Sequence, residues 1–498
     1  MARVAIIGSG FSGLSAASYI AAAGHDVHLF EKNAGPGGRA RQIHTDSGYL
    51  FDMGPSWYWM PDVFEKFFND FGLSTHEMYD LKLLDPSFNI VFGQEDTMHV
   101  PADFIPLCNL FEQIEPGSSI KLKEFLCEAG RKYKTAMDNI VYKPGLSITE
   151  FADIKIIRDA IRLNLFGSLS KHVRRYFRNP KLIALMEFPV LFLGASPAET
   201  PALYSLMNYA GLKLGTWYPM GGFGAVVKAM LNVAESNGVT LHLNSTVEKI
   251  DVGDRKVKNI VVNGHVFNCD AVIATADYNH IEQCLLDPIY RNYDKAYWEK
   301  KRLAPSCLIF FIGVNKEIAR LNHHNLFFDE DMALHSKEIY QDPKWPTRPL
   351  FYVCCTSKTD PHVAPPGHEN LFILLPIAPG LEDSPEIRGN YFRLIMERLE
   401  SYTGENIRSQ IDYQESYCIN DFISDYNSYK GNAYGLANTL MQTANLKPKI
   451  RNKKVKNLFY AGQFTVPGPG VPPSIISGKI AAQQLLKNLN PANEVSVR

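Results

Sequence analysis

The chain has 498 residues, of which 46% are hydrophobic and 21% charged, the balance of a globular protein with a large core and two or three domains. The 51 Lys and Arg residues nearly match the 52 Asp and Glu residues, which gives a formal net charge of −1. The chain therefore has no overall positive electrostatic field that would attract nucleic acid. The eight cysteines form no Cys-x-x-Cys pair, which excludes the usual zinc and iron–sulfur motifs, and we expect no metal site.

We expect neither a secretory signal nor a membrane-spanning segment. The apolar residues 4–7 follow directly on Met1-Ala2-Arg3, which leaves no room for a signal peptide. No apolar run reaches the roughly 20 residues that cross a bilayer. Because scattered free thiols also suit a reducing compartment, the sequence favours a cytoplasmic protein that is soluble or attached to one membrane surface.

The first 31 residues carry the strongest motif. A short apolar strand is predicted over residues 4–7, a helix over 14–23 and a second strand over 27–30. The turn between the first strand and the helix is Gly8-Ser9-Gly10-Phe11-Ser12-Gly13. This order is typical of the parallel β-α-β unit that binds a dinucleotide.

Each of the turn glycines has a physical role in such a unit. Gly8 makes the tight turn, Gly10 lets a pyrophosphate approach the backbone, and Gly13 lets helix and strand pack closely. The helix N-terminus presents free N–H groups and the positive end of its dipole to the phosphates. Glu31, after the second strand, can accept hydrogen bonds from an adenosine ribose.

The next segment, Gly35-Pro36-Gly37-Gly38-Arg39, favours FAD over NAD. Gly37 and Gly38 permit backbone contact along the ribityl-phosphate arm of a flavin, and Arg39 can neutralise phosphate charge. This extension resembles that of the flavoprotein family that includes amine oxidases, protoporphyrinogen oxidases and carotenoid desaturases. A later cluster, Gly221-Gly222-Phe223-Gly224, lacks a preceding apolar strand and a following acid, so FAD should be the only nucleotide.

Two later segments are expected to complete the flavin site. Residues 242–250 have a strand pattern, and resemblance to the same flavoprotein family implies that Val247 touches the adenine. Near the C-terminus, a strand ending in Gly462-Gln463 leads through a Pro- and Gly-rich segment into a helix predicted over 474–487. The N-terminus of that helix would direct its positive dipole end at the flavin pyrimidine. The two ends of the chain would thus build one site.

Five further segments resemble bacterial-type carotenoid (phytoene) desaturases, and the likeness runs in order from residue 1 to about 487. These segments are residues 51–62, 200–204, 217–222, 323–328 and 429–436. The resemblance implies an α/β fold with a Rossmann-like FAD-binding domain of the amine oxidase/phytoene desaturase type, a mixed-sheet substrate domain and a helical membrane-contacting insert. The expected boundaries are 1–80, 220–296 and 450–498 for the FAD domain, 81–100 and 297–449 for the substrate domain, and 101–219 for the insert.

The family oxidises long polyenes by hydride transfer to flavin N5, with loss of a proton from the neighbouring carbon. Two departures point away from phytoene: Asn89 stands where phytoene desaturases often carry arginine, and residues 438–444 look closer to members that act on hydroxylated or half-cyclised carotenoids. The resemblance therefore implies 3,4-desaturation of a hydroxylated carotenoid, acyclic or monocyclic. The alternatives are a phytoene desaturase, a carotenoid isomerase, an amine oxidase, and a flavin-free binding protein of the Rab GDP-dissociation inhibitor type.

A substrate of this kind dissolves in the bilayer, so the enzyme needs a way onto the membrane. Residues 149–181 hold eight basic residues against three acidic ones, interleaved with apolar residues, which is typical of an amphipathic helix on a membrane surface. We expect peripheral membrane attachment through this stretch, and reoxidation of the flavin by a membrane quinone or O2. The sequence does not indicate an oligomeric state.

Flavin desaturation depends on geometry and an apolar cavity more than on a fixed acid–base pair. Candidate proton acceptors are Glu150, Asp153, His323 and His324, and of the two histidines at most one should reach the site, because neighbours on a strand face opposite ways. The aromatic residues expected to line a substrate tunnel are Trp57, Tyr58, Trp59 and Tyr434. The residues expected to bind the cofactor are Gly8, Gly10, Phe11, Ser12, Gly13, Glu31, Lys32, Gly37, Gly38, Arg39, Gly54, Pro55, Ser56, Val247, Gly462, Gln463, Gly470, Val471 and Pro472.

Overall fold

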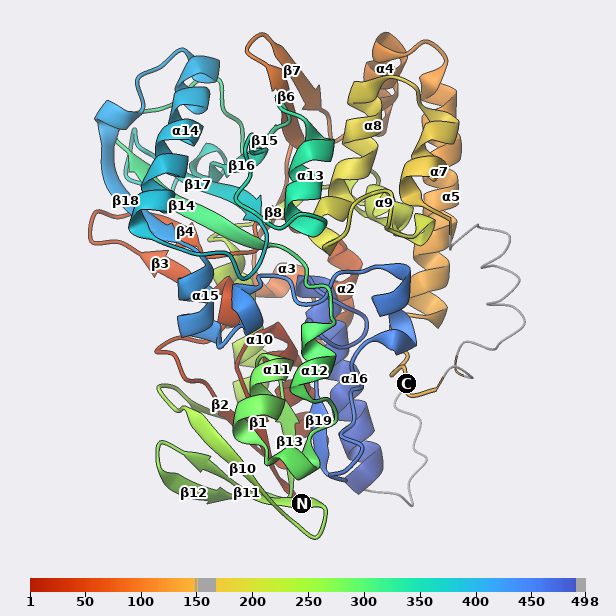
Figure 1. Cartoon of the computed structure of the whole chain (residues 1–498), viewed down its shortest axis with the longest axis vertical. Coiled ribbons are helices and arrows are strands. Elements are labelled where there is room, and N and C mark those ends of the chain that lie inside the picture. Colours follow the sequence, from red (N-terminus) through yellow and green to blue (C-terminus); the bar gives the residue numbers. More distant parts are fainter. Residues whose placement is uncertain (148–149, 151–166, 490–498) are drawn as a thin grey trace.

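A five-stranded parallel sheet forms the lower part of the molecule in Figure 1. The computed structural model, which describes residues 1–147, 150 and 167–489, places the predicted first strand at the centre of this sheet. Val4, Ala5 and Ile6 are fully buried there, because a central parallel strand is covered on both faces. In order across the sheet, the strands are β19 (Leu458–Tyr460), β13 (Ala271–Ala274), β1 (Arg3–Ile7), β2 (Asp26–Phe30) and β9 (Thr240–His242).

Helix α1 (Phe11–Ala22) packs against α16 (Val471–Leu489), which comes from the other end of the chain. The two backbones approach closely at Gly478, where a Cβ would lie 2.3 Å from the carbonyl oxygen of Ser12. Ser15 Oγ donates a hydrogen bond of 2.8 Å to the carbonyl oxygen of Ile475. The first and last helices of the described chain are therefore held together as one unit.

Helix α16 begins at Val471, three residues earlier than predicted. Pro472 and Pro473 lie in its first turn, where a missing N–H breaks no helical hydrogen bond. Helix α10 (Phe223–Ser236) also packs against α1, and it follows a short strand, β8 (Trp217–Pro219), that the sequence analysis did not expect. Because β8 pairs antiparallel with β5 (Leu81–Leu83), outside the parallel sheet, this strand–glycine–helix run is not a second dinucleotide-binding unit.

A three-stranded antiparallel sheet packs beside the parallel one. Ile250, Val257 and Ile260 share a buried core with Ala5 and Val272 of the central strands. The strands are β10 (Val247–Gly253), β11 (Lys256–Val262) and β12 (His265–Asn268), and the short helices nearby in the sequence are α11 (Tyr278–His280) and α12 (Lys295–Glu299).

A seven-stranded mixed sheet forms the upper left of Figure 1. All its pairings are antiparallel except that between β15 and β6. One face packs under α14 (Pro385–Thr403), whose Ile395, Met396 and Leu399 join the core of Leu308 and Phe310. The strands in order are β18 (Ile411–Tyr417), β14 (Ser306–Val314), β17 (Glu369–Ile377), β16 (Phe351–Cys354), β15 (His324–Phe327), β6 (Phe88–Gly93) and β7 (Asp96–Val100), and the remaining helices around this sheet are α13 (Met332–Tyr340) and α15 (Ile419–Tyr426).

Helices gather at the upper right of Figure 1. They are α4 (Phe104–Ile114), α5 (Ser118–Asn139), α7 (Leu169–Tyr176), α8 (Pro180–Glu187) and α9 (Leu206–Leu212). Below them lie α2 (Pro61–Asn69) and α3 (Thr75–Met78), and the hairpin β3 (Gln42–His44) and β4 (Leu50–Asp52) lies on the opposite side. Over the described ranges, no helix is both long and apolar enough to cross a membrane. The predicted α/β class, with a parallel and a mixed sheet, is confirmed.

Candidate functional site

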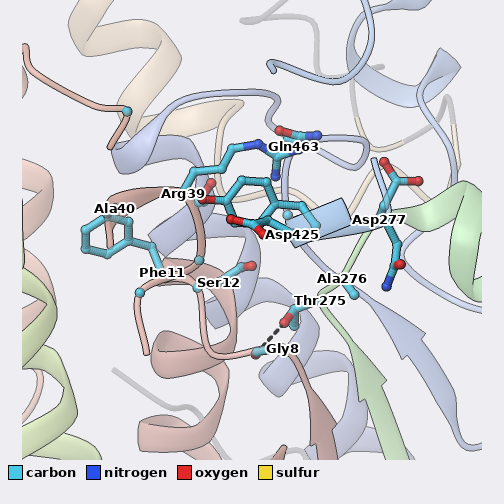
Figure 2. A pocket seen from close by; sticks show the side chains of 18 of the residues that line it. Gly8, Phe11, Ser12, Arg39, Ala40, Thr275, Ala276, Asp277, Asp425 and Gln463 are labelled. Carbon is cyan, nitrogen blue, oxygen red and sulfur yellow. Dashed lines mark hydrogen bonds between the residues drawn. The ribbon is translucent and has the colours of Figure 1, made fainter. Parts of the chain in front are cut away.

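A cavity of about 1640 Å³, counting the part open to solvent, lies where the strands of the parallel sheet end (Figure 2). Open α/β sheets bind their ligands at this edge. The walls come from both ends of the chain and from its middle. They include residues 7–8, 10–12, 30–33, 37–40, 53–55, 245–247, 275–278, 425–427, 461–464 and 470–471.

The predicted glycine turn forms one wall of this cavity. Gly8 has a φ of +101°, which L side chains rarely adopt, and a Cβ at Gly13 would lie 1.9 Å from the Gly8 carbonyl oxygen. Thr275 Oγ1 lies 2.9 and 2.8 Å from the carbonyl oxygens of Ile7 and Gly8, to which it donates (Figure 2). Both positions therefore require glycine, and the neighbouring strand holds the turn in place.

The N-terminus of α1 opens onto the cavity without a side-chain cap from any described residue. Gly10 is its N-cap residue, and Phe11 and Ser12 in the first turn line the cavity. The second glycine pair lies directly opposite, since a Cβ at Gly38 would be 3.2 Å from Gly10 Cα. Uncapped N–H groups and a positive dipole end suit a phosphate, and the glycines leave the backbone accessible.

Glu31, which directly follows β2, is 5% exposed and lines the cavity. One carboxylate oxygen accepts hydrogen bonds from Ser9 N and Oγ at 3.0 and 2.7 Å. The other accepts from Asn33 N and Nδ2, both at 3.0 Å. Because a carboxylate offers about four lone-pair sites, a ribose hydroxyl would have to share or displace the Asn33 side chain. Glu31 thus holds the glycine turn as well as offering an acceptor.

Arg39 extends across the cavity beside Gln463 (Figure 2). Its Nη2 donates to Ser428 Oγ at 3.2 Å and to the Asn432 carbonyl oxygen at 3.3 Å, and its guanidinium lies 5.0 Å from the ring centroid of Tyr426. Its Nε is buried and has no hydrogen-bond partner among the described residues. A guanidinium with an N–H to spare in a cavity is suited to a phosphate oxygen.

The C-terminal segment brings a second helix N-terminus to the cavity. Gly462 N donates to Ser477 Oγ of α16 at 3.0 Å, which fixes the loop against the helix. Gly470 and Val471 line the cavity where α16 begins. Of the predicted cofactor residues, those on the cavity wall are Gly8, Gly10, Phe11, Ser12, Glu31, Lys32, Gly37, Gly38, Arg39, Gly54, Pro55, Val247, Gly462, Gln463, Gly470 and Val471, whereas Gly13, Ser56 and Pro472 do not line it.

Two groups are notable among the lining residues that were not predicted from the sequence. Thr275 and Asp277 follow β13, and the apolar run before them was a usable signal, because parallel strands end at the same edge. Asp277 is buried, which raises the pKa of its carboxyl, and it accepts hydrogen bonds from three backbone N–H groups. Asp425 and Tyr426, at the end of α15, reach the cavity only through tertiary packing, for which the sequence gives no signal.

A second, largely apolar cavity of about 680 Å³ adjoins the first. Leu374 and Tyr434 line both cavities, so the two meet at these side chains. Tyr434 is thus placed where a tunnel beside the flavin was expected. The other walls of the second cavity include Phe188, Leu191, Leu326, Phe328, Ile339, Leu350 and Phe351.

The three aromatic residues Trp57, Tyr58 and Trp59 line neither of these two cavities. Tyr58 is fully buried and its hydroxyl lies 2.7 Å from that of Tyr79. Trp59 Nε1 donates to Thr216 Oγ1 at 2.9 Å, and Trp57 stacks on His324 with ring centroids 4.2 Å apart. These side chains pack the core around the site. Their role in binding substrate stays a prediction.

The two candidate histidines are buried side by side, with ring centroids 4.5 Å apart. The expectation that they face opposite ways was wrong, because β15 begins only at His324 and His323 lies before the strand. His323 Nδ1 lies 2.7 Å from Thr359 Oγ1, and His324 Nδ1 lies 2.6 Å from the hydroxyl of Tyr352. Burial lowers the pKa of His323 to about 3 and that of His324 well below its usual value, so both rings are neutral.

These histidines also lie near a thiol. The side-chain ligand atoms of His323, His324 and Cys354 fall within 4.8 Å of one another, a grouping that could hold a metal ion in principle. Burial raises the pKa of the Cys354 thiol to about 12, which disfavours the thiolate that a metal requires. The expectation of a protein without a metal site stays a prediction.

The candidate acids are placed differently. Glu150 accepts hydrogen bonds from the backbone N–H groups of Gly145, Leu146 and Ser147, so its carboxylate closes a turn of its own chain. Asp153 lies outside the described residues, as do the other residues from 151 to 166 of the basic stretch predicted to contact a membrane. Asn89 is buried in the mixed sheet, where its Oδ1 accepts from Asn322 Nδ2 at 3.1 Å.

Similarity to known proteins assigns the chain to a family. Residues 11–486 match the family model described as flavin containing amine oxidoreductase. A carotenoid 3,4-desaturase from Haloarcula japonica is 42% identical over 487 residues, which cover 98% of each chain. The chain belongs to the carotenoid desaturase family of flavin-containing amine oxidoreductases. A zeta-carotene-forming phytoene desaturase from Myxococcus xanthus is 29% identical over 97% of this chain and 94% of its own.

Solved structures show the same fold at low identity. Wild-type putrescine oxidase bound to putrescine is 14% identical with a TM-score of 0.62, over 97% of this chain and 99% of the other. A Rab GDI from Plasmodium falciparum is 11% identical with a TM-score of 0.56, over 98% of each chain. The fold is therefore shared by oxidases and by a protein of the Rab GDI class, and the site has to distinguish them.

FAD is the cofactor of this family, and the site fits it. The uncapped N-terminus of α1, the N-terminus of α16 on the cavity wall, the paired glycine loops and the buried guanidinium of Arg39 suit a pyrophosphate and a flavin. The acceptor Glu31 suits the ribose. These features lie on one continuous cavity wall. The residue assignments themselves follow from geometry and stay predictions.

Proposed function

We propose that this protein is an FAD-dependent carotenoid desaturase that removes two hydrogens from adjacent carbons, by 3,4-desaturation. The observation that carries this proposal is the apolar cavity that joins the flavin cavity at Leu374 and Tyr434. A long hydrocarbon needs such a water-excluding channel, whereas a small amine would need a polar anchor. The 42% identity to a carotenoid 3,4-desaturase supports the same assignment.

The residues around the two cavities would orient the substrate and exclude water from it. When bound, FAD accepts the hydride. Leu374 and Tyr434 stand at the junction of the cavities, so they would hold the polyene carbons against the flavin. The neutral His323 and His324 and the saturated carboxylate of Glu150 are all held in other contacts, so we assign the proton acceptor to none of them.

The substrate is proposed to be hydroxylated and either acyclic or monocyclic. A phytoene desaturase or a carotenoid isomerase would use the same two cavities, so products decide between them. The purified protein in liposomes would be incubated with phytoene, with an acyclic hydroxycarotenoid and with a monocyclic one. Loss of two hydrogens at C3–C4, seen by mass and absorption spectra, is expected. Isomerised but not oxidised product, or desaturation of phytoene alone, would contradict the proposal.

We further propose that the protein is a peripheral membrane protein on the cytoplasmic side and that a quinone or O2 reoxidises the flavin. The substrate dissolves in the bilayer, and α7 carries the exposed residues Lys171, Arg174 and Arg175.

The proposed domain division assigns the parallel sheet to 1–80, 220–296 and 450–498, the mixed sheet to 81–100 and 297–449, and the helices at the upper right of Figure 1 to 101–219.

A further inference from the structure

Most polar side chains on the wall of the second cavity already have hydrogen-bond partners. The paired ones are Ser306, His335, Tyr340 and Tyr352. Among the described residues, the hydroxyls of Ser336 and Tyr434 on this wall have no such partner. A polar group that faces an apolar cavity loses free energy unless it is paired. These two hydroxyls are therefore the places where a bound ligand can gain a hydrogen bond.

Of these two residues, Tyr434 also lines the flavin cavity. Its side chain is partly buried, and its hydroxyl oxygen is not one of the fully enclosed, unpartnered atoms of the described core, so a ligand in the cavities can reach it. Arg39 and Cys307 are its electrostatic neighbours on the flavin side. Tyr340 and Tyr352 are its neighbours on the side of the second cavity. The hydroxyl thus stands where the two cavities meet.

The backbone around Tyr434 is held in one conformation. Ala304 N donates to the Gly435 carbonyl oxygen at 2.8 Å, and Gly435 N donates to Asn432 Oδ1 at 2.7 Å. Gly435 has a φ of +79°, and a Cβ there would lie 3.0 Å from Gln463 Cγ of the flavin-site loop. A side chain on such a fixed turn loses little entropy when a ligand binds, so a single hydrogen bond from it can discriminate between ligands.

The phenol selects the chemistry of its partner. Burial raises the pKa of the Tyr434 hydroxyl, so the group stays protonated and neutral. It can donate one hydrogen bond and also accept. A hydroxyl group on the ligand matches both properties without bringing a charge into an apolar cavity, whereas a hydrocarbon leaves the phenol unpaired.

We propose that the Tyr434 hydroxyl binds a hydroxyl group of the polyene close to the carbons that lose hydrogen, which makes Tyr434 a specificity-determining residue. This inference rests on the proposed function. Carbons 3 and 4 lie near one end of a carotenoid, and each carbon–carbon bond spans only about 1.5 Å, so a hydroxyl at that end lies beside the reacting carbons. Tyr434 stands at the junction where those carbons would meet the flavin, and the bond would fix which pair of carbons faces it.

The test compares two ligands that differ by one hydroxyl. FAD-loaded protein in detergent micelles, reduced without oxygen so that it accepts no hydride, would be titrated with an acyclic C40 polyene hydrocarbon and with the same polyene carrying a hydroxyl at one end. The shift of polyene absorption reports binding. Wild type should bind the hydroxylated ligand roughly threefold to tenfold more tightly, the scale of one neutral hydrogen bond. In Tyr434→Phe, which keeps the ring, this preference should disappear while the affinity for the hydrocarbon stays the same.

The other unpartnered hydroxyl provides the matched control. Ser336, on α13, lines the second cavity but not the flavin cavity. Ser336→Ala should therefore leave the preference unchanged. FAD content and hydrocarbon affinity, measured in parallel, show whether each variant is folded. If Tyr434→Phe fails these checks, Tyr434→Met, which also lacks the hydroxyl, takes its place.

Each outcome decides the matter. No preference in wild type, a preference that survives in Tyr434→Phe, or its loss in Ser336→Ala overturns the assignment to Tyr434. A shifted flavin absorption spectrum in Tyr434→Phe with the preference intact would assign the hydroxyl to the cofactor instead. Desaturated product from the oxidised protein without any preference would support the proposed function and overturn the site. A preference that depends on Tyr434 in a protein that forms no desaturated product would support the site and overturn the proposed reaction. Binding of neither polyene overturns both.

Discussion

Single charged groups hold the flavin site in shape before any ligand arrives. Glu31 illustrates this, because its carboxylate accepts from both the backbone and the hydroxyl of Ser9. Replacing Glu31 with alanine should therefore remove a ribose acceptor and loosen the glycine turn together. We expect FAD affinity to fall by roughly 1.5–3 kcal/mol, the scale of hydrogen bonds to a charged group. Equilibrium titration of apoprotein with FAD would measure it.

A variant of the neighbouring Asn33 tests whether a ribose hydroxyl takes the place of the Asn33 amide on Glu31. Asn33→Ala removes one donor to the carboxylate while the backbone N–H of Asn33 still binds it. If a ribose displaces the Asn33 amide, this variant should bind FAD as well as wild type or better. An unchanged FAD affinity in Glu31→Ala would contradict the assigned role of Glu31.

The buried amine of Lys447 predicts how stability depends on pH. Its pKa is about 7 in the folded protein against 10.5 in the unfolded chain, so between these values the unfolded chain binds more protons. The free energy of unfolding should therefore rise with pH over this range, by up to about 1.4 kcal/mol per pH unit. Below pH 7 the amine is protonated in both states and its contribution to this slope ends.

Denaturant unfolding of FAD-loaded wild type and Lys447→Met at pH 7, 8 and 9 measures this slope. The variant lacks the titrating amine, so wild type should become more stable relative to the variant as pH rises. Parallel curves over this range would contradict the lowered pKa of Lys447.

At the scale of elements, the site depends on how closely α1 and α16 approach. A Cβ at Gly478 would lie 2.3 Å from the carbonyl oxygen of Ser12, in the first turn of α1. Gly478→Ala should force the helices apart, destabilise the protein by about 1–3 kcal/mol and weaken FAD binding. Thermal unfolding and FAD retention on gel filtration would show it.

The matched control for Gly478→Ala is Gly389→Ala in α14. No atom comes within 4 Å of a Cβ at Gly389, and alanine is the better helix former. This variant should be as stable as wild type or up to about 1 kcal/mol more stable. Equal effects of the two substitutions would contradict the close-contact explanation.

Local elements with a strong pattern were predictable, and contacts between distant segments were not. The run Val4 to Ile7, the glycine turn and Glu31 follow rules that act over a few residues, and the structure places them together. The start of α16 was misplaced, because two prolines read as a boundary although a first helical turn accepts them. The neighbouring rings of His323 and His324 and the approach of Asp425 depend on tertiary packing, which periodicity does not reveal.

For the whole molecule, one cavity is assembled from both chain ends, and a second, walled partly by the mixed sheet, shares Leu374 and Tyr434 with it. This arrangement explains why a single fold serves oxidases of different substrates: the parallel sheet holds the cofactor, and the elements inserted between its strands shape the second cavity. The inserted part also carries the helix α7, whose basic residues face solvent. We propose that a lipid-soluble substrate enters through this inserted part.

The exposed basic residues of α7 predict attachment to an anionic membrane. Arg174 pairs with Glu187, whereas Lys171 and Arg175 are exposed and form no ion pair within the described ranges, so reversing these two changes surface charge without breaking a pair. Lys171→Glu with Arg175→Glu should weaken binding to anionic liposomes roughly tenfold or more, since each basic residue near such a surface contributes about 1 kcal/mol. The exposed Lys256 and Lys300, reversed as a control, should leave binding unchanged.

Anaerobic turnover on these liposomes should proceed with a quinone and fail with NAD⁺ as the only acceptor, because the chain has one nucleotide-binding motif. Strict dependence on NAD⁺ would exclude the proposed acceptor, and full liposome binding by the α7 variant would exclude this attachment surface.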